Sequence, residues 1–248
     1  MSSSRSVADK VCAVLDAICA APGGLNATEI ARRTDMPTST AHRLVRTLAN
    51  WGGLERQANG RYRAGLRLWE VAASAPRASG LRDAVRPYLE DLYEATGQNV
   101  QLAVRDGREA LVVEHFAARD AIATATRIGG RLPLHASGVG QVLLAWSPPE
   151  EQEAVLAGPL ERFTDRTHAD PSGLRRVLAE VRRSGVAVAS NSMPLPALAI
   201  AAPVTDRGGA CAAAMAVVVP SELTSTPYVA AVIAAARGAS RALAASGG

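Results

Sequence analysis

Two neighbouring segments near the N-terminus place apolar and polar residues at helical spacing. The longer one has apolar residues at the i, i+3, i+4 and i+7 positions of one buried face, namely Ala41, Leu44, Val45 and Leu48. A shorter helix is predicted before it over 27–34, because Asn26 and Glu29 have the spacing of a capping box. Pro37 disfavours helical backbone in the residue before it and suits the start of a new helix. Two helices joined by so short a break are typical of a helix-turn-helix.

The outer side of these helices carries side chains suited to DNA. Arginine can bind guanine with two hydrogen bonds or hold a phosphate, and Thr or Ser near a helix start can reach phosphates or base edges. The candidate DNA-binding residues on the two helices are Thr28, Thr38, Ser39, Thr40, His42, Arg43 and Arg46.

A basic hairpin is predicted directly behind the second helix. Two strand-like runs, 54–57 and 61–64, are joined through Asn59-Gly60, a strong signal for a tight turn. Arg61 and Arg63 would face phosphates or the minor groove. The pattern therefore predicts a winged helix-turn-helix over 1–65, with a small helical domain bearing a solvated arginine face as the alternative.

The remaining apolar pattern predicts one more helix in this domain, a linker and a second domain. The helix covers 7–21, with inward positions Val7, Val11, Val14, Leu15 and Ile18. The linker, 66–80, holds an apolar helix that ends near Pro76. In 81–248, helices are predicted over 81–96, 136–146, 149–156, 171–184 and 227–245, and strands over 99–105, 109–116, 121–127, 186–190, 197–205 and 210–219. Helices that flank a mostly antiparallel sheet make this an α+β fold.

Charge is divided unevenly between the two parts. Residues 1–80 hold 11 Lys and Arg against 6 Asp and Glu, a net charge of +5, whereas 81–248 hold 16 against 17. The positive excess therefore lies in the predicted DNA-binding part, as attraction to phosphates requires. The start, MSSSRSVADK, lacks the apolar core of a signal peptide, and no run is long and apolar enough for a membrane span. We expect a cytoplasmic protein without membrane contact.

The second domain shows no catalytic constellation. Ser137 lacks the G-x-S-x-G pattern of a nucleophile elbow. Gly138-Val139-Gly140 lacks both the full dinucleotide pattern and the lysine of a phosphate loop. The sequence therefore predicts no enzyme and no cofactor.

Metal binding is not expected either. Three histidines, His115, His135 and His168, have no metal-ligand spacing. Cys12 and Cys19 lie seven apart on one helix face and are expected in the core, and Cys211 falls in an apolar strand.

Three segments, in order along the chain, resemble the IclR family of bacterial transcription regulators. Ser39–Leu48 is similar to the family's recognition helix, which usually reads sTxxRLLxTL, and the later segments are Arg131–Gly138 (RLPLHASG) and Ile200–Val204 (IAAPV). The match covers nearly the whole chain. It implies a winged helix-turn-helix, a linker helix that packs in a dimer, and a GAF-like effector-binding and oligomerisation domain over 81–248.

The resemblance also implies a small-molecule site between the loop around 132–138 and the last strands. Carried across position by position, its wall is Ala121, Leu132, Gly138, Val139, Ala189, Ala197, Ala199, Ala216 and Val218. This chain departs from the family where many members have an acidic pair followed by glycine, because it has Ser190-Asn191-Ser192 there. It departs again where many have a serine-bearing strand, because it has Ala216-Val217-Val218.

Those departures change the expected ligand. A small carboxylate that is buried without hydrogen-bond partners is costly, and Ala216 and Val218 cannot supply them. We therefore expect a larger, more apolar effector oriented by Ser190, Asn191 or Ser192. The alternative is a collapsed, purely structural domain.

The sequence as a whole predicts a homo-oligomeric transcription regulator, a dimer or tetramer. It would bind a pseudo-palindromic operator in double-stranded DNA, most simply as a repressor, and a small-molecule effector would modulate it. Two other hypotheses stay open. One is a non-specific architectural DNA binder with a ligand-free second domain, and the other is a small-molecule enzyme or sensor whose winged helix contacts proteins.

Overall fold

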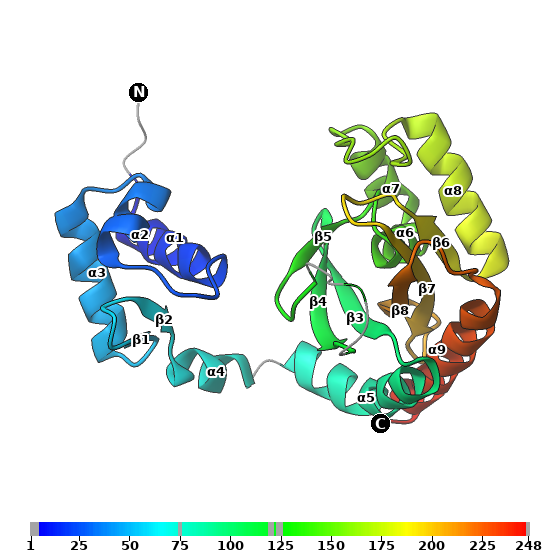
Figure 1. Cartoon of the computed structure of the whole chain (residues 1–248), viewed down its shortest axis with the longest axis horizontal. Coiled ribbons are helices and arrows are strands. Elements are labelled where there is room, and N and C mark those ends of the chain that lie inside the picture. The colour runs from blue at the N-terminus through cyan, green and yellow to red at the C-terminus, as the bar shows by residue number, and fades with distance from the viewer. Residues whose placement is uncertain (1–4, 74–75, 119–121, 123–125, 247–248) are drawn as a thin grey trace. The chain divides into compact units, whose positions relative to one another are not determined.

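The chain forms two compact units, Met1–Ser79 and Gly80–Gly248. The computed structural model (Figure 1) describes residues 5–73, 76–118, 122 and 126–246, with the backbone alone for 76–79.

The first unit packs three helices against a hairpin. The helices are α1 (Val7–Cys19), α2 (Ala27–Thr34) and α3 (Thr38–Asn50), and the hairpin pairs β1 (Leu54–Arg56) with β2 (Tyr62–Ala64). Their shared core includes Val14, Ile30 and Val45, which are almost fully buried. A fourth helix, α4 (Leu66–Ala73), follows the hairpin.

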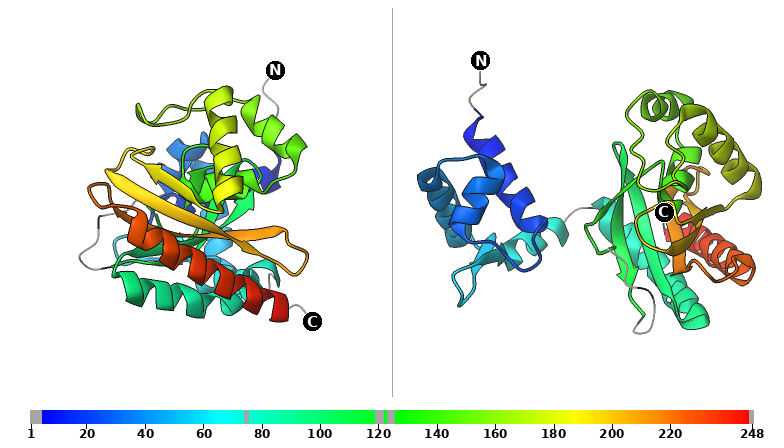
Figure 2. Two further views of the ribbon diagram at one scale, coloured as in Figure 1. Left: turned by 90° about the vertical axis from the view of Figure 1, so that its right-hand side faces the viewer. Right: turned by 45° about the horizontal axis from the view of Figure 1, so that its top comes forward.

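The second unit is a six-stranded sheet with helices on both faces (Figures 1 and 2). Its strands are β3 (Asn99–Asp106), β4 (Glu109–Phe116), β5 (Arg131–Pro133), β6 (Ala187–Ser190), β7 (Ala197–Thr205) and β8 (Cys211–Pro220). They lie in the order β5-β4-β3-β8-β7-β6, and each neighbouring pair is antiparallel. The helices are α5 (Pro76–Thr96), α6 (Gly138–Ala145), α7 (Pro149–Leu156), α8 (Pro171–Ser184) and α9 (Thr226–Ser246). The predicted α+β class with an antiparallel sheet is confirmed.

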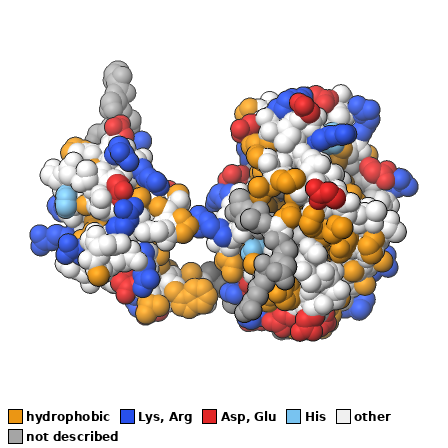
Figure 3. Space-filling model, in the orientation of Figure 1, with side chains coloured by type: hydrophobic (Ala, Val, Ile, Leu, Met, Phe, Trp, Pro, Cys, Tyr) orange, Lys and Arg blue, Asp and Glu red, His pale blue; other side chains and the backbone are white. Residues whose placement is uncertain are grey.

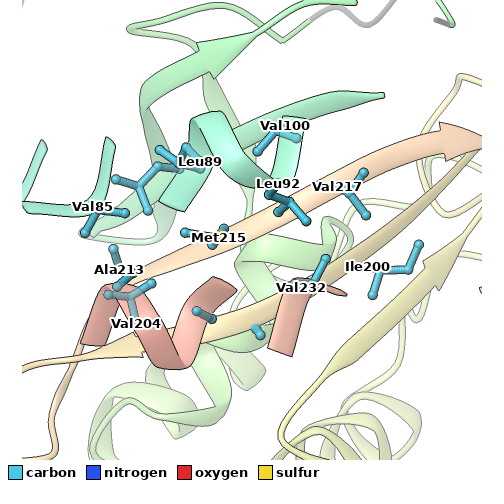
Figure 4. Close-up of a cluster of buried hydrophobic side chains, with 14 of the residues drawn as sticks. Val85, Leu89, Leu92, Val100, Ile200, Val204, Ala213, Met215, Val217 and Val232 are labelled. Atoms are coloured by element: carbon cyan, nitrogen blue, oxygen red, sulfur yellow. The ribbon is translucent and has the colours of Figure 1, made fainter. Parts of the chain in front are cut away.

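One face of the sheet packs on α5 and α9 through large apolar side chains. Leu89 of α5, Val217 of β8 and Val232 of α9 meet in this cluster (Figure 4). By length and composition alone α9 is apolar enough to cross a membrane, but its Val232, Ala236 and Ala239 are buried in this core.

The opposite face packs on α6 and α8 through much smaller residues. Alternation along the strands places Ala201, Ala214 and Ala216 on this side. Every residue of α6 is buried, and two of its glycines permit the close approach. A Cβ at Gly138 would lie 3.0 Å from the Cβ of Ala199, and one at Gly140 would lie 2.6 Å from the Cα of Leu134.

The structure corrects several positions in the first unit. Val7, predicted inward, is 62% exposed in the first turn of α1, where the core does not reach it. Cys12 and Cys19 are exposed and not in the core. Cys211, in the second unit, is half-buried in the apolar strand β8, as predicted, and burial raises the pKa of its thiol to about 12.

Other corrections concern the second unit. The helix predicted from residue 81 begins at Pro76, because proline is well tolerated in a first helical turn. The strand predicted over 121–127 lies largely outside the described residues, and Ile122, Thr126 and Arg127 are not in a strand. The short edge strand β5 was not predicted as a strand.

Leu89→Ala should lower the free energy of unfolding by about 2–5 kcal/mol, because it leaves a cavity in the fully buried α5 contact. Leu223→Ala is the matched control, since Leu223 is exposed and should change stability by less than about 0.5 kcal/mol. Denaturant unfolding followed by circular dichroism measures both. Equal effects in the two variants would contradict the assigned core.

Candidate functional site

Local contacts fix both ends of α2 and thereby the start of α3. The Asn26 side chain accepts from the Glu29 N–H at 2.9 Å, and the Glu29 carboxylate accepts from the Asn26 N–H at 2.8 Å, which completes the predicted capping box. Asp35 ends α2 in the left-handed region with φ 51°. Helix α3 then buries the predicted face, Ala41, Leu44, Val45 and Leu48.

The polar side of α3 is open to solvent. Five of the predicted DNA-binding residues on it are exposed and Thr40 is half-buried; the exposed ones are Thr38, Ser39, His42, Arg43 and Arg46. Thr28, near the start of α2, is also exposed. No ion pair holds Arg43 or Arg46 within the part of the chain that the structure describes. Lys and Arg side chains are spread over the visible face of this unit (Figure 3). This surface can therefore offer several cations to one duplex.

The wing is fixed to the helices by backbone and by Arg61. Leu25 and Tyr62 exchange two backbone hydrogen bonds, of 3.0 and 2.7 Å. The Arg61 guanidinium donates to the Gly24 carbonyl through Nε (3.0 Å) and Nη2 (2.9 Å), and it pairs with Glu29 at 3.0 Å. The same Glu29 accepts from Asn26, and that backbone hydrogen bond is the main reason why its pKa is lowered. Arg61 therefore braces the wing against α2.

Arg63 and Arg56 are the outward cations of the wing. The Arg63 guanidinium donates to Glu55 across the hairpin at 2.9 Å, and both side chains are more than half exposed. Arg56 is exposed at the end of β1. An exposed pair of this kind contributes little to stability, so Arg63 can exchange Glu55 for a phosphate at small cost.

The predicted effector wall maps onto the small-residue face of the sheet. Cross-strand pairing puts Ala189, Ala199 and Val218 in one row across β6, β7 and β8. Gly138, at the buried start of α6, lies directly on Ala199. The next row contains Ala216, and Val139 is fully buried in α6.

Other predicted wall residues lie further away. Ala197 is half-buried one step along β7, opposite Pro220. Leu132 pairs with Ala110 at the β5 edge and is partly buried. Ala121 lies outside the described residues.

The predicted polar residues after β6 are only partly on this face. Burial alternates along β6, so Ala189 is buried while Ser190 is exposed. The Asn191 backbone accepts from the Thr164 hydroxyl at 2.6 Å. Ser192 is buried, and its hydroxyl donates to the Ala136 carbonyl at 2.7 Å. Ser192 thus holds the turn after β6 against the start of α6.

The serine and the histidine of the LPLHASG loop are likewise bound within the protein. The Ser137 hydroxyl donates to the Pro133 carbonyl at 2.8 Å and accepts from the Gly140 N–H, so it caps α6. His135 is hydrogen-bonded to the Glu161 carbonyl at 2.8 Å and stacks on Phe163. Neither arrangement provides a nucleophile with a base.

Gln101 and His115 lie on the same sheet face, although neither was predicted to bind a ligand. Gln101 of β3 pairs with Ala216 on one side and with His115 of β4 on the other. Gln101 Oε1 and His115 Nε2 are both buried, and neither has a hydrogen-bond partner among the residues that the structure describes. Desolvation lowers the pKa of His115, which favours the neutral ring. In the sequence, Asn99 and Gln101 stand at alternate positions of an otherwise apolar strand, a pattern that indicates polar side chains on one face of the sheet.

A cavity of about 460 Å³ opens beside β6 and α8. Its lining includes Ala189 and Ser190 of β6. Other lining residues are polar or titratable, namely Gln141, Arg166, His168, Arg176, Glu180 and Ser192.

Two family models match the chain, one in each unit. The IclR helix-turn-helix domain model matches residues 7–58, and the model of the bacterial transcriptional regulator IclR C-terminal domain matches residues 74–245.

This chain belongs to the IclR family.

Curated relatives and a solved structure agree with this assignment. The chain is 35% identical to the HTH-type transcriptional regulator BhcR of Paracoccus denitrificans over 215 residues, which is 86% of this chain and 77% of that protein. It is 30% identical to the transcriptional repressor IclR of Escherichia coli, over 78% of this chain and 72% of that one. An IclR homolog from Microbacterium hydrocarbonoxydans, solved in complex with 4-hydroxybenzoate, matches 97% of this chain and 100% of its own with a TM-score of 0.90 and 36% identity.

Membership in the IclR family assigns the general activity. The protein is a DNA-binding transcriptional regulator and not an enzyme, as the sequence predicted. Its first unit carries the helix-turn-helix, and its second unit is the regulatory domain of the family.

Arg61→Ala should loosen the wing, because the variant loses the hydrogen bonds to Gly24 and Glu29. We expect the backbone amides of Leu25 and Tyr62 to exchange with deuterium roughly 5-fold faster, as the loss of about 1 kcal/mol of local stability implies. Arg63→Ala, two residues along the wing, is the matched control and should leave this exchange unchanged. The bracing role is wrong if both variants exchange alike.

Proposed function

We propose that this regulator binds a pseudo-palindromic operator as a homo-oligomer, represses transcription, and changes its affinity for DNA when an aromatic hydroxycarboxylate occupies the second unit. Repression is supported by a relative described as a transcriptional repressor, IclR of Escherichia coli. The site of action would be the cytoplasm, where the operator is. We further propose that the chain divides into a DNA-binding part (1–65), a linker (66–80) and a regulatory part (81–248).

Recognition is assigned to the outer side of α3. Arg43, His42 and Arg46 lie exposed on it. In a helix-turn-helix the second helix enters the major groove, where an arginine can read guanine. Thr38 and Ser39 at the start of α3, with Thr28 on α2, are suited to phosphates. Arg63 would reach the backbone from the wing, whereas Arg61 contributes mainly by holding the wing in place.

Self-association is supported by an apolar surface around α4. Leu66 is 80% exposed and Trp69 is 62% exposed, and Trp51 at the end of α3 is also exposed. Large apolar side chains grouped on one surface usually mark a protein interface. A second copy of the chain covers them in our proposal. Two recognition helices related by a twofold axis would then meet half-sites about one helical turn apart.

The effector class is supported by the solved relative and by the chemistry of the small-residue face. The Microbacterium homolog is 36% identical and was solved with 4-hydroxybenzoate. In the present chain Ala199, Ala216 and Val218 supply apolar surface for a ring. The buried start of α6 at Gly138 presents helix N-terminal N–H groups, which favour a carboxylate. An aromatic acid meets both requirements, whereas glyoxylate or pyruvate would leave the apolar surface unfilled.

Arg43→Ala should weaken operator binding by about 1–3 kcal/mol if Arg43 reads a base. Fluorescence anisotropy against the protein's own upstream DNA and a scrambled duplex measures this, in a series of salt concentrations, because counterion release makes such binding strongly salt-dependent. Arg207→Ala, an exposed arginine of the β7–β8 turn, is the control and should bind like the wild type. Equal wild-type affinity for both duplexes would favour an architectural DNA binder.

4-Hydroxybenzoate should raise the melting temperature of the protein and change its affinity for the operator, because a ligand that binds only the folded state stabilises it. Glyoxylate and pyruvate at the same concentrations should have little effect. A thermal-shift series followed by operator titration measures both responses. Strong stabilisation by the two small acids would instead show that the site accepts small carboxylates.

A further inference from the structure

Three polar side chains project from β3 and β4 onto the sheet face that packs under α6. Asn99 and Gln101 alternate along β3, and His115 of β4 is the cross-strand neighbour of Gln101. On the other side of β3, Asn99 adjoins Val218 and Gln101 adjoins Ala216. The polar group is therefore continuous with the apolar rows that end at Ala199 and Ala189.

Only one of these three side chains is fully paired among the described residues. Asn99 donates to the Ile122 carbonyl at 2.8 Å and accepts from the Ala118 N–H at 3.1 Å, so both ends of its amide are used. Gln101 is 4% exposed, and its Oε1 has no partner. His115 Nε2 is buried and also has none. Buried polar atoms are nearly always paired, so two unpaired atoms on directly opposite residues of neighbouring strands call for an occupant.

The chemistry of the pair defines what that occupant offers. An amide oxygen only accepts a hydrogen bond, so Gln101 Oε1 requires a donor and repels a carboxylate. A neutral imidazole nitrogen donates or accepts according to its tautomer. A hydroxyl group is both donor and acceptor, and it can donate to Gln101 Oε1 while it accepts from the Nε2–H of His115. A carboxylate could accept from the Nε2–H of His115, but it has no hydrogen to donate to Gln101 Oε1.

We propose that Gln101 and His115 form the polar end of the effector site and select ligands that carry a hydroxyl group opposite their carboxylate. This inference rests on the proposed aromatic effector and names the residues that distinguish one aromatic acid from another. Two strand spacings separate β3 from β7, about 10 Å. Ala199 of β7 lies against Gly138 at the start of α6, so a para-substituted ring extends from that helix end toward the pair. The polar anchors that the last strands lack are thus supplied by β3 and β4.

The test is isothermal titration of the full-length protein with 4-hydroxybenzoate and with benzoate. The wild type should prefer 4-hydroxybenzoate by roughly 10-fold or more, because without the hydroxyl the two buried groups stay unpaired. Gln101→Met and His115→Leu should each remove most of this preference while benzoate still binds. Gln98→Met is the matched control. Gln98 Oε1 is also buried without a partner among the described residues, but Gln98 precedes the paired residues of β3, so this variant should keep the full preference.

The outcomes separate this inference from the proposed function. If the wild type binds neither acid, the proposed effector class fails and the inference fails with it. If the wild type prefers 4-hydroxybenzoate and both variants keep that preference, the pair holds a water molecule only, and the inference alone is overturned. An unchanged melting temperature of the ligand-free Gln101→Met protein would show that the variant is folded. His115→Leu provides an independent measurement if it is not.

Discussion

The close approach of α6 to the sheet is the constraint on which the regulatory unit depends. Gly138 lies so near Ala199 that a Cβ in its place would lie 3.0 Å from the alanine methyl group. Such contact is possible only when both surfaces are built from glycine and alanine, and the strand positions Ala201 and Ala216 continue that surface. The two sides of the sheet consequently differ in character. One side is an ordinary core that includes Leu89, Val217 and Val232. On the other side the strands contribute mainly alanine side chains.

In our proposal this asymmetry lets the second unit combine a stable core with a place for a ligand. A close-packed core of large side chains resists change, because a lost methylene costs free energy and an added one causes strain. A face lined by alanine has fewer side-chain atoms to rearrange. The functional surface of the first unit is built differently. There the working side chains are long and cationic, and they lie outside the core that positions them.

Local signals in the sequence predicted much of this fold. The bounds of α2, β4, α7, α8 and β7 agree with the prediction because each has a local marker, such as the capping box at Asn26 or the proline that opens α7 and α8. The bounds of elements that lack such a marker were predicted less accurately. The first turn of α5 precedes its apolar face, and β5 is three residues long and exists through its pairing with β4.

The candidate site was harder to predict for a related reason. The outer face of α3 follows from one periodic segment, so its exposed residues were assigned from the sequence. The pairing of Gln101 with His115 depends on the register of two strands and on a bulge in β3 and β4. Arg61 was placed on the DNA side because it follows Asn59-Gly60, but its partners Gly24 and Glu29 are more than thirty residues earlier. Neither relation is visible until the chain is folded.

The bracing of the wing by Arg61 has a consequence for how the regulator meets DNA. A loop that becomes ordered only when it binds its target loses conformational entropy on binding. This loss makes the free energy of binding less favourable. Here Leu25 and Tyr62 pair, and the Arg61 guanidinium holds the wing to α2, through contacts within the protein itself. In the proposed complex, helix and wing therefore reach the groove as one preformed surface, and little of the binding free energy is lost in ordering the protein.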